Sequence, residues 1–211
     1  MTITYRATKG AALTHNELDG NFADLDSRTA DGWADIVAEL YTRGGPASPV
    51  PTSYKGGIYL YEFTPGDTLE VFSNFHIPHS WKLGTMLYPH FHFATTSNAT
   101  GVVRIGFEYT LAQRTGGGSN DRFGATQTIT VDFNIHANSA DVHFVCEAPD
   151  LGGIPGTTLD VDGMVLCRIF REGAHVNDTF PESIWGITAD MHIEVDKAST
   201  PFRAQNFMTG P

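Results

Sequence analysis

The sequence predicts a mainly β protein, with an N-terminal helical attachment segment followed by an antiparallel β-sandwich of the jelly-roll kind. Three observations support this fold class. The 211 residues include 22 glycines and 11 prolines, which supply many turns between short strands. Most of the chain alternates between polar and apolar residues with the period of a strand, whereas a helix-start signal stands at Thr14. Helix-length periodic patterns are missing between the predicted strands, which argues against an alternating α/β arrangement.

The helix-start signal is complete. Thr14 and Glu17 have the spacing of a capping box, in which each side chain accepts a hydrogen bond from the backbone amide of the other residue. Leu13 and Leu18 occupy the two positions of a hydrophobic staple, which sets the angle of entry into the helix. The preceding residues 1–9 are expected to form an extended arm.

The helical region is expected to run from about Thr14 to Tyr41. Its apolar stripe consists of Leu18, Phe22, Leu25 and Ile36, with Trp33, Val37 and Leu40 on a second apolar edge. Gly20 and Gly32 each cost about 1 kcal/mol relative to Ala inside a helix, so we expect two helices with a break near residues 30–32. Because such a segment is marginal in water by itself, the stripe must pack on the body, on sister copies or on a partner.

A Pro/Gly-rich segment divides the chain. Arg43–Pro51 contains prolines and glycines that end a helix and favour an extended spacer. The predicted organisation is therefore an attachment and oligomerisation segment at 1–42, a linker at 43–53 and a β-sandwich domain at 54–211.

The β domain is predicted from runs of period-two alternation separated by turn residues. The expected strands are 57–64, 68–75, 85–95, 102–113, 126–136, 142–148, 163–171 and 185–195. This number of antiparallel strands in roughly 150 residues fits two packed sheets, most simply a jelly roll.

Composition restricts the function. The net charge of −11, from 13 basic and 24 acidic residues, disfavours nucleic acid as a partner, because phosphate binding requires clustered Lys and Arg. Neither a secretion signal nor a membrane span is expected, because the chain has no basic start before an apolar stretch and no run of about 18 apolar residues. We therefore expect the protein to be synthesised in a cytoplasm. Cys146 and Cys167 lie in apolar runs and are expected to be buried thiols, with a disulfide as the alternative if their strands are neighbours.

Two histidines have metal-ligand spacing. His90 and His92 lie two apart on a predicted strand, so their side chains share one face. Neutral imidazoles suit Zn, Fe and Ni, but two ligands are too few. Three interpretations stay open: hydrogen bonds within or between sheets, a metal ion on the axis of a trimer, and a single-chain site completed by His192 and Glu194. The expectation is that no cofactor is required.

Catalysis is not expected. The chain lacks a nucleophile elbow, a phosphate-binding loop and a locally supported Cys/His pair, and Asp160 and Asp162 are too few for a calcium loop. The strand carboxylates that could form a glycosidase pair are Glu62, Glu108, Asp132 and Glu194. The aromatic residues that crowd the first half of the β domain are expected in the core and a subunit interface, with a carbohydrate site as the alternative.

Two parts of the sequence resemble bacteriophage proteins. The first is the N-terminal motif T-Y-x-x-x-K-G-x-x-L-T-x-x-E-L-D-x-N-F, carried here by Thr4 to Phe22, which is similar to the start of phage tail-fibre and tail-appendage proteins. The body resembles a family of phage virion proteins through Pro89–Phe93, Thr100–Tyr109, Met164–Arg171 and Asp190–Asp196. Ile105 departs from that pattern, where an aromatic residue is usual.

The resemblance implies a structural component of a tailed-phage virion, made in the bacterial host cytoplasm. The expected form is a homotrimeric tail fibre or appendage that contacts other virion proteins through its N-terminal helix and binds a host surface receptor or glycan. A capsid decoration protein is the alternative within this class, and a carbohydrate-binding or glycan-degrading module is the alternative of another class.

Overall fold

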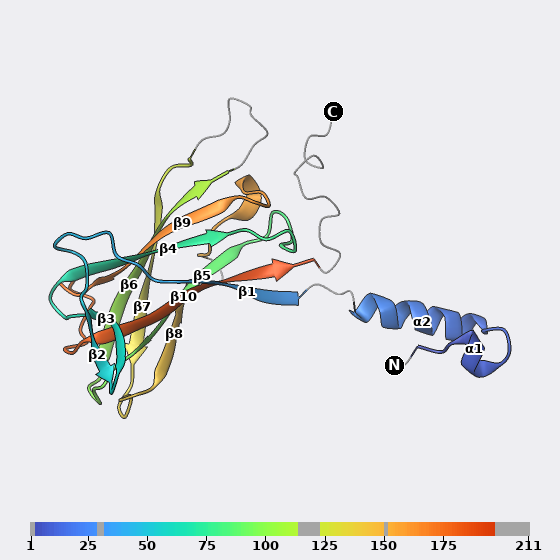
Figure 1. The fold of residues 1–211 in the computed structure, drawn as a ribbon, viewed down its shortest axis with the longest axis horizontal. Coiled ribbons are helices and arrows are strands. Elements are labelled where there is room, and N and C mark those ends of the chain that lie inside the picture. The colour runs from blue at the N-terminus through green and yellow to red at the C-terminus, as the bar shows by residue number, and fades with distance from the viewer. Residues whose placement is uncertain (1–2, 29–31, 114–122, 150–151, 197–211) are drawn as a thin grey trace.

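The computed structural model describes residues 3–28, 32–113, 123–149 and 152–196. The strands form two facing β-sheets, and Figure 1 shows the N-terminal helical residues standing clear of them. The elements are α1 (Arg6–Lys9), α2 (His15–Arg28), β1 (Gly32–Ala38), β2 (Pro51–Lys55), β3 (Ile58–Phe63), β4 (Thr68–His76), β5 (Leu87–Ala94), β6 (Gly101–Ala112), β7 (Gln127–Ile135), β8 (His143–Glu147), the short 3-10 helix η1 (Gly156–Thr158), β9 (Met164–Glu172) and β10 (Ile184–Val195).

The strand order is that of a jelly roll. One sheet, here called sheet A, has the order β2-β3-β10-β5-β8, and β1 also pairs with β10. The other, sheet B, has the order β4-β9-β6-β7. Every described pairing is antiparallel, and successive strands alternate between the sheets from β3 to β6. This interleaved order confirms the predicted fold class, and the eight strands expected from the sequence are β3 to β10.

The core lies between the two sheets. Phe91 and Phe93 from sheet A and Ile105 and Phe107 from sheet B are fully buried there. Burial of each such side chain contributes about 1.5–3 kcal/mol, which makes this layer the main source of stability.

Both cysteines are buried free thiols, as predicted. Cys146 lies on β8 in sheet A, and Cys167 lies on β9 in sheet B. Burial raises the pKa of each thiol to about 12, so both stay protonated at neutral pH and act as small core residues.

The expected second helix is wrong. Gly32–Ala38 forms β1, which pairs with β10 from Gly32↔Val195 to Ala38↔Ala189. Ala34 and Ile36 pack against the core, whereas Trp33 is exposed. The apolar residues of this segment have helical spacing, which predicted a helix. The free edge of β10 nevertheless offers a strand partner far along the chain, and local periodicity does not reveal such a partner. The segment 1–42 therefore divides between helices and sandwich.

The expected spacer at 43–53 lies along the sandwich instead. Its carbonyl groups at Ala47 and Val50 accept hydrogen bonds from the amides of Glu70 (2.8 Å) and Glu62 (3.3 Å). Pro51 begins β2, where an edge strand tolerates the missing N–H group. The Pro-rich segment is thus extended, as predicted, but it packs along the sheets and does not separate two domains.

A buried ion pair ties the β9–β10 connection to both sheets. The side chains of Arg171 and Asp178 are completely buried, with Nε–Oδ2 and Nη2–Oδ1 distances of 2.9 and 2.8 Å. The remaining guanidinium hydrogens go to the carbonyl oxygens of Phe63, Phe180 and Glu182. Bidentate geometry with every donor satisfied is the condition under which a buried charge is tolerated.

We expect Asp178→Asn to lower the free energy of unfolding by about 3–5 kcal/mol, because it leaves the Arg171 charge buried without its counter-ion. Urea unfolding of the full chain measures this. Asp132→Asn is the matched control, because Asp132 pairs with Arg104 at a partly exposed position and should cost less than about 1 kcal/mol. An equal decrease in the free energy of unfolding in the two variants would contradict the conclusion that Asp178 neutralises a buried charge.

Candidate functional site

The start of α2 has the predicted capping box. The Thr14 amide donates to Glu17 Oε2 at 2.7 Å, and the Glu17 amide donates to Thr14 Oγ1 at 3.3 Å. Lys9 Nζ also pairs with the Glu17 carboxylate. The hydrogen bonds from Lys9 and then from Thr14 lower the pKa of Glu17 to about 2. Leu13, the first residue of the expected staple, is half-buried.

The N-terminal arm folds back on α2. Thr4 N donates to Asn21 Oδ1 at 2.7 Å, and Asn21 Nδ2 donates to Thr4 O at 2.9 Å. The expected extended arm instead contains the single turn α1, which ends at Gly10 in the left-handed conformation with φ of 69°. Arm and helix together make one short unit.

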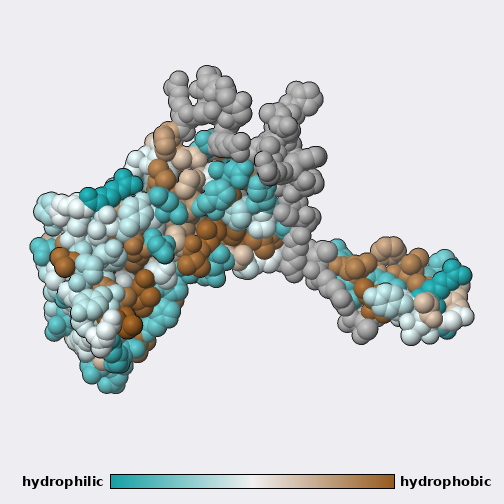
Figure 2. Space-filling view, in the orientation of Figure 1, coloured by the Kyte–Doolittle hydropathy of each residue, from teal (hydrophilic) through white to brown (hydrophobic). Residues whose placement is uncertain are grey.

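The apolar stripe on this unit is open. Leu18, Phe22 and Leu25 are 43%, 62% and 46% exposed, and Figure 2 shows apolar surface along the two helices. Ile36, expected on the same stripe, is instead packed against the core from β1. Three large apolar side chains on one helix therefore expose about half of their surface each.

A second candidate site lies on the outer face of sheet A. A β-bulge between Gly186 and Thr188 shifts the register of β10 against β5. Gly186 before the bulge and Ala189 after it both face the core, so the bulge turns Asp190 and His192 outward. They join His90, paired directly with Asp190, and His92 on β5.

His90, His92 and Asp190 form the closest group. Asp190 Oδ2 lies 3.6 Å from His90 Nε2 and 3.4 Å from His92 Nε2. His92 Nδ1 lies 2.7 Å from His143 Nε2 on β8, and the two rings stack. His90 is only 2% exposed, although it lies on an outer face. Buried atoms without a hydrogen-bond partner include His90 Nδ1, His92 Nε2 and Asp190 Oδ1.

His192 lies beside this group and has different partners. Its ring centroid is 4.3 Å from that of His90. Its Nε2 lies 2.9 Å from Asp35 Oδ1 on β1, and its Nδ1 pairs with Glu147 on β8. Glu194, expected beside His192 as a ligand, pairs with Lys82 at 2.9 Å instead.

The charges in the cluster favour a cation. Burial, followed by the neighbouring His192 and His92, lowers the pKa of His90, and burial also lowers the pKa of His92. Both imidazoles are therefore neutral near pH 7, whereas Asp35, Glu147 and Asp190 supply negative charge around them. Neutral imidazole nitrogens and carboxylate oxygens together form a donor set for divalent transition metals.

Several of these residues were missed by sequence reasoning. His90, His92 and His192 lie together, as one of the three open interpretations required, but Asp190, Asp35, His143 and Glu147 were not expected in the site. The alternation of Asp190 and His192 on the last strand was the available signal. Asp35 lies on β1, and His143 and Glu147 lie on β8. Only the strand order of sheet A brings these strands close to the histidines of β5.

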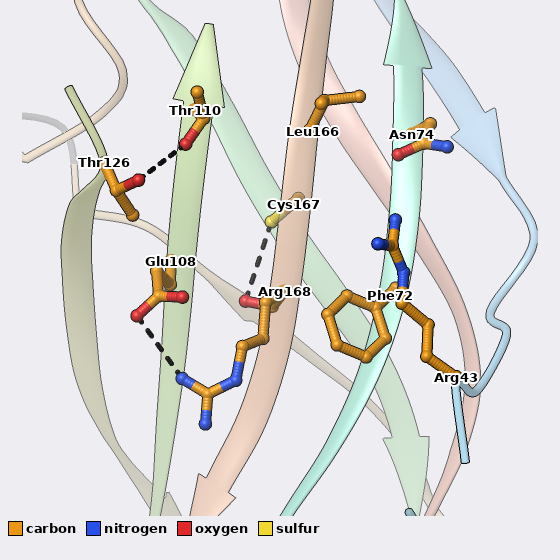
Figure 3. A pocket seen from close by; sticks show the side chains of 9 residues that line it. All are labelled: Arg43, Phe72, Asn74, Glu108, Thr110, Thr126, Leu166, Cys167 and Arg168. Atoms are coloured by element: carbon orange, nitrogen blue, oxygen red, sulfur yellow. Dashed lines mark hydrogen bonds and ion pairs between the residues drawn. The ribbon is translucent and has the colours of Figure 1, made fainter. Parts of the chain in front are cut away.

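A groove of about 230 Å³ lies on the opposite outer face, over sheet B (Figure 3). Its floor includes the Phe72 ring, with the Arg43 guanidinium 4.8 Å above the ring centroid. Glu108 and Arg168 pair across it at 3.4 Å. The lining residues are Arg43, Phe72, Asn74, Glu108, Thr110, Thr126, Leu166, Cys167 and Arg168. An aromatic ring among hydroxyl, amide and charged groups can contact a polar ligand with apolar faces.

The carboxylates weighed for glycoside hydrolysis have separate partners. Glu62 accepts from the Ser183 hydroxyl at 2.7 Å, and Asp132 pairs with Arg104. Glu108 on sheet B pairs with Arg168, whereas Glu194 on sheet A pairs with Lys82. Their arrangement does not assemble a pair of carboxylates aimed at one point.

No protein-family model and no curated protein matches the chain. Among solved structures, infectious bursal disease virus Gx strain matches at 13% identity and a TM-score of 0.38, over 81% of this chain and 33% of that one. The chain thus spans about a third of that viral protein. Family 16 carbohydrate-binding module-2 matches at 11% identity and a TM-score of 0.36, over 72% of this chain and 89% of the module.

The carbohydrate-binding module CBM35 of Abf62 from Cellvibrio japonicus matches at 10% identity and a TM-score of 0.34, over 77% of this chain and 93% of that one. Similarity at this level carries no argument about binding or assembly. Separately, neither helix in the described residues is long and apolar enough to cross a membrane.

Acid should weaken the start of α2. Because the pKa of Glu17 is lowered from 4.5 to about 2, the cap contributes fully above pH 4.5 and is lost as the pH falls through about 2. NMR amide shifts of α2 should follow this course, and Glu17→Gln should abolish it while the amides of β5 report the sandwich. A cap titration near pH 4.5 in the parent chain would contradict the interpretation.

Proposed function

We propose that the chain is a structural component of a tailed-bacteriophage virion, a trimeric tail-fibre or tail-appendage protein that attaches through its N-terminal helix. In this proposal the α1–α2 unit contacts sister copies or other virion proteins, and the jelly-roll body projects from the particle and contacts the host surface. The protein acts by assembly and not by catalysis.

The open apolar stripe on α2 carries the proposal. A helix of 14 residues is close to the length at which isolated helices are marginal in water. Nevertheless, its start is specified by a capping box, a Lys9 ion pair and the Thr4–Asn21 hydrogen bonds. Burying the exposed parts of Leu18, Phe22 and Leu25 in a partner interface would add about 2–5 kcal/mol before ordering costs. A defined helix with an uncovered stripe is typical of a segment that docks.

The capsid decoration protein remains the alternative within this class. A trimeric fibre places three α2 stripes against each other, which closes cyclic symmetry at few copies per particle. A decoration protein places each stripe on a neighbouring shell subunit, which requires hundreds of copies. Quantitative mass spectrometry of purified particles counts the copies and separates the two.

The groove over sheet B supports a second candidate, glycan binding by the body. Phe72 offers an aromatic face, and Asn74, Glu108 and Arg168 offer polar groups around it. This activity would add to the structural role, because a fibre that contacts a host requires a surface for its receptor.

We expect Phe22→Asp combined with Leu25→Asp to abolish oligomers of the full chain and its incorporation into particles, because charges would then be buried in the interface. Analytical ultracentrifugation of the purified chain and immunoblotting of phage particles measure the two effects. Val176→Asp is the matched control, because Val176 is 85% exposed on the body and should change neither result.

Two outcomes would overturn the attachment proposal. One is a parent chain that stays monomeric and is absent from particles. The other is a double variant that assembles as well as the Val176→Asp control.

The glycan candidate is checked with the same protein. We expect Phe72→Ala to weaken retention on host-cell polysaccharide at least tenfold, since stacking on an aromatic ring is lost. Tyr59→Ala, at a 65% exposed aromatic residue of sheet A, is the control. Equal retention of the Phe72→Ala variant and the parent would exclude the groove.

A further inference from the structure

We propose that His90, His92 and Asp190 bind one divalent transition-metal ion within a single chain, with zinc as the reference ion. The site lies on the outer face of sheet A, where the two central strands β5 and β10 meet. It is separate from the attachment helix and from the groove over sheet B, and it does not depend on the proposed function.

The spacing of the ligand atoms fits a metal. Zinc binds imidazole nitrogen and carboxylate oxygen at about 2.0–2.2 Å, so two ligands of a tetrahedral zinc lie about 3.4 Å apart. Asp190 Oδ2 is 3.4 Å from His92 Nε2 and 3.6 Å from His90 Nε2. One ligand atom from each of the three residues lies within 4.8 Å of the others. These separations are long for hydrogen bonds and close to those of shared ligands.

Unsatisfied polar atoms are the second observation. His90 has 2% exposure, and its Nδ1 has no hydrogen-bond partner. His92 Nε2 and Asp190 Oδ1 are also buried without one. Each such atom costs free energy unless something binds it. His92 Nε2 is both unsatisfied and 3.4 Å from Asp190 Oδ2, so a cation bound between these two side chains would remove part of this cost.

His143 orients the site. Its Nε2 lies 2.7 Å from His92 Nδ1, and a proton carried on His92 Nδ1 leaves the lone pair of Nε2 free for a metal. A hydrogen bond to the second nitrogen of a histidine ligand sets the tautomer in this way in many metal sites. His143 is therefore a positioning residue.

The adjacent group of Asp35, His90 and His192 also has metal-ligand geometry, but it is less suited. Both nitrogens of His192 already face carboxylates, Asp35 on one side and Glu147 on the other. Asp35 and Glu147 therefore contribute a negative electrostatic potential around the site. This potential attracts a cation toward His90, His92 and Asp190. The three protein ligands leave a fourth position for water or another ligand.

The bound ion should fix the register of sheet A. Asp190 follows the β-bulge of β10, and His90 and His92 lie on the neighbouring strand. A cation bridging the two strands after the bulge therefore resists slippage at the point where pairing is irregular. Stabilisation on metal binding is the thermodynamic consequence, because the unfolded chain lacks the assembled site.

The test is isothermal titration of the tag-free, metal-stripped full chain with zinc chloride, together with cobalt absorption spectra that report ligand geometry. We expect one ion per chain and a rise in melting temperature on loading. Asp190→Asn should weaken binding at least 100-fold and His143→Gln about 10–100-fold. Circular dichroism verifies that each variant folds, and His92→Gln replaces Asp190→Asn if the latter does not.

Asp162→Asn is the matched control. Asp162 Oδ1 lies 3.5 Å from His76 Nε2 and 3.2 Å from His79 Nε2, so the same substitution alters a second aspartate beside two histidines. Among the described residues this second group does not have the ligand-atom spacing of a metal site. This variant should keep the parent affinity. Binding that falls equally in both aspartate variants, or no binding to the parent, would overturn the proposal. A stoichiometry of one ion per three chains would instead indicate a metal on a trimer axis and would also overturn it.

Discussion

The architecture depends on the buried pair of Arg171 and Asp178. Arg171 lies on β9 in sheet B, whereas the carbonyl groups that it binds belong to β3 of sheet A and to the connection before β10. Asp178 also accepts from the Arg104 amide on β6 at 3.0 Å. Because these bonds hold the connection in place, they define where β10 enters sheet A.

The entry of β10 determines both outer features of sheet A. β10 pairs with β5 on one edge and with β3 and then β1 on the other. The bulge near Ile187 then reverses which residues face outward, so that Asp190 and His192 meet the histidines of β5. The proposed metal site and the pairing of β1 thus follow from one strand and its irregularity. Helix α2 precedes β1 in the chain, and β1 pairs with this same strand, β10.

The molecule divides its tasks between parts with different physical requirements. The sandwich buries most of its aromatic and aliphatic side chains in one internal core. The helix α2 has strong local start signals and exposes large parts of Leu18, Phe22 and Leu25. The proposed attachment through α2 depends on this difference between the two parts.

Local sequence determined much of this protein, and long-range pairing decided the rest. The capping box at Thr14 and Glu17 and the eight jelly-roll strands could be predicted, because hydrogen bonds three residues apart and period-two alternation are local properties. The strand at Ile36 could not, because its partner lies more than 150 residues away on β10. The histidine pair was visible, but its carboxylate neighbour was not. Only the bulge decides which face Asp190 occupies, and a one-residue shift moves every later side chain of a strand to the other face.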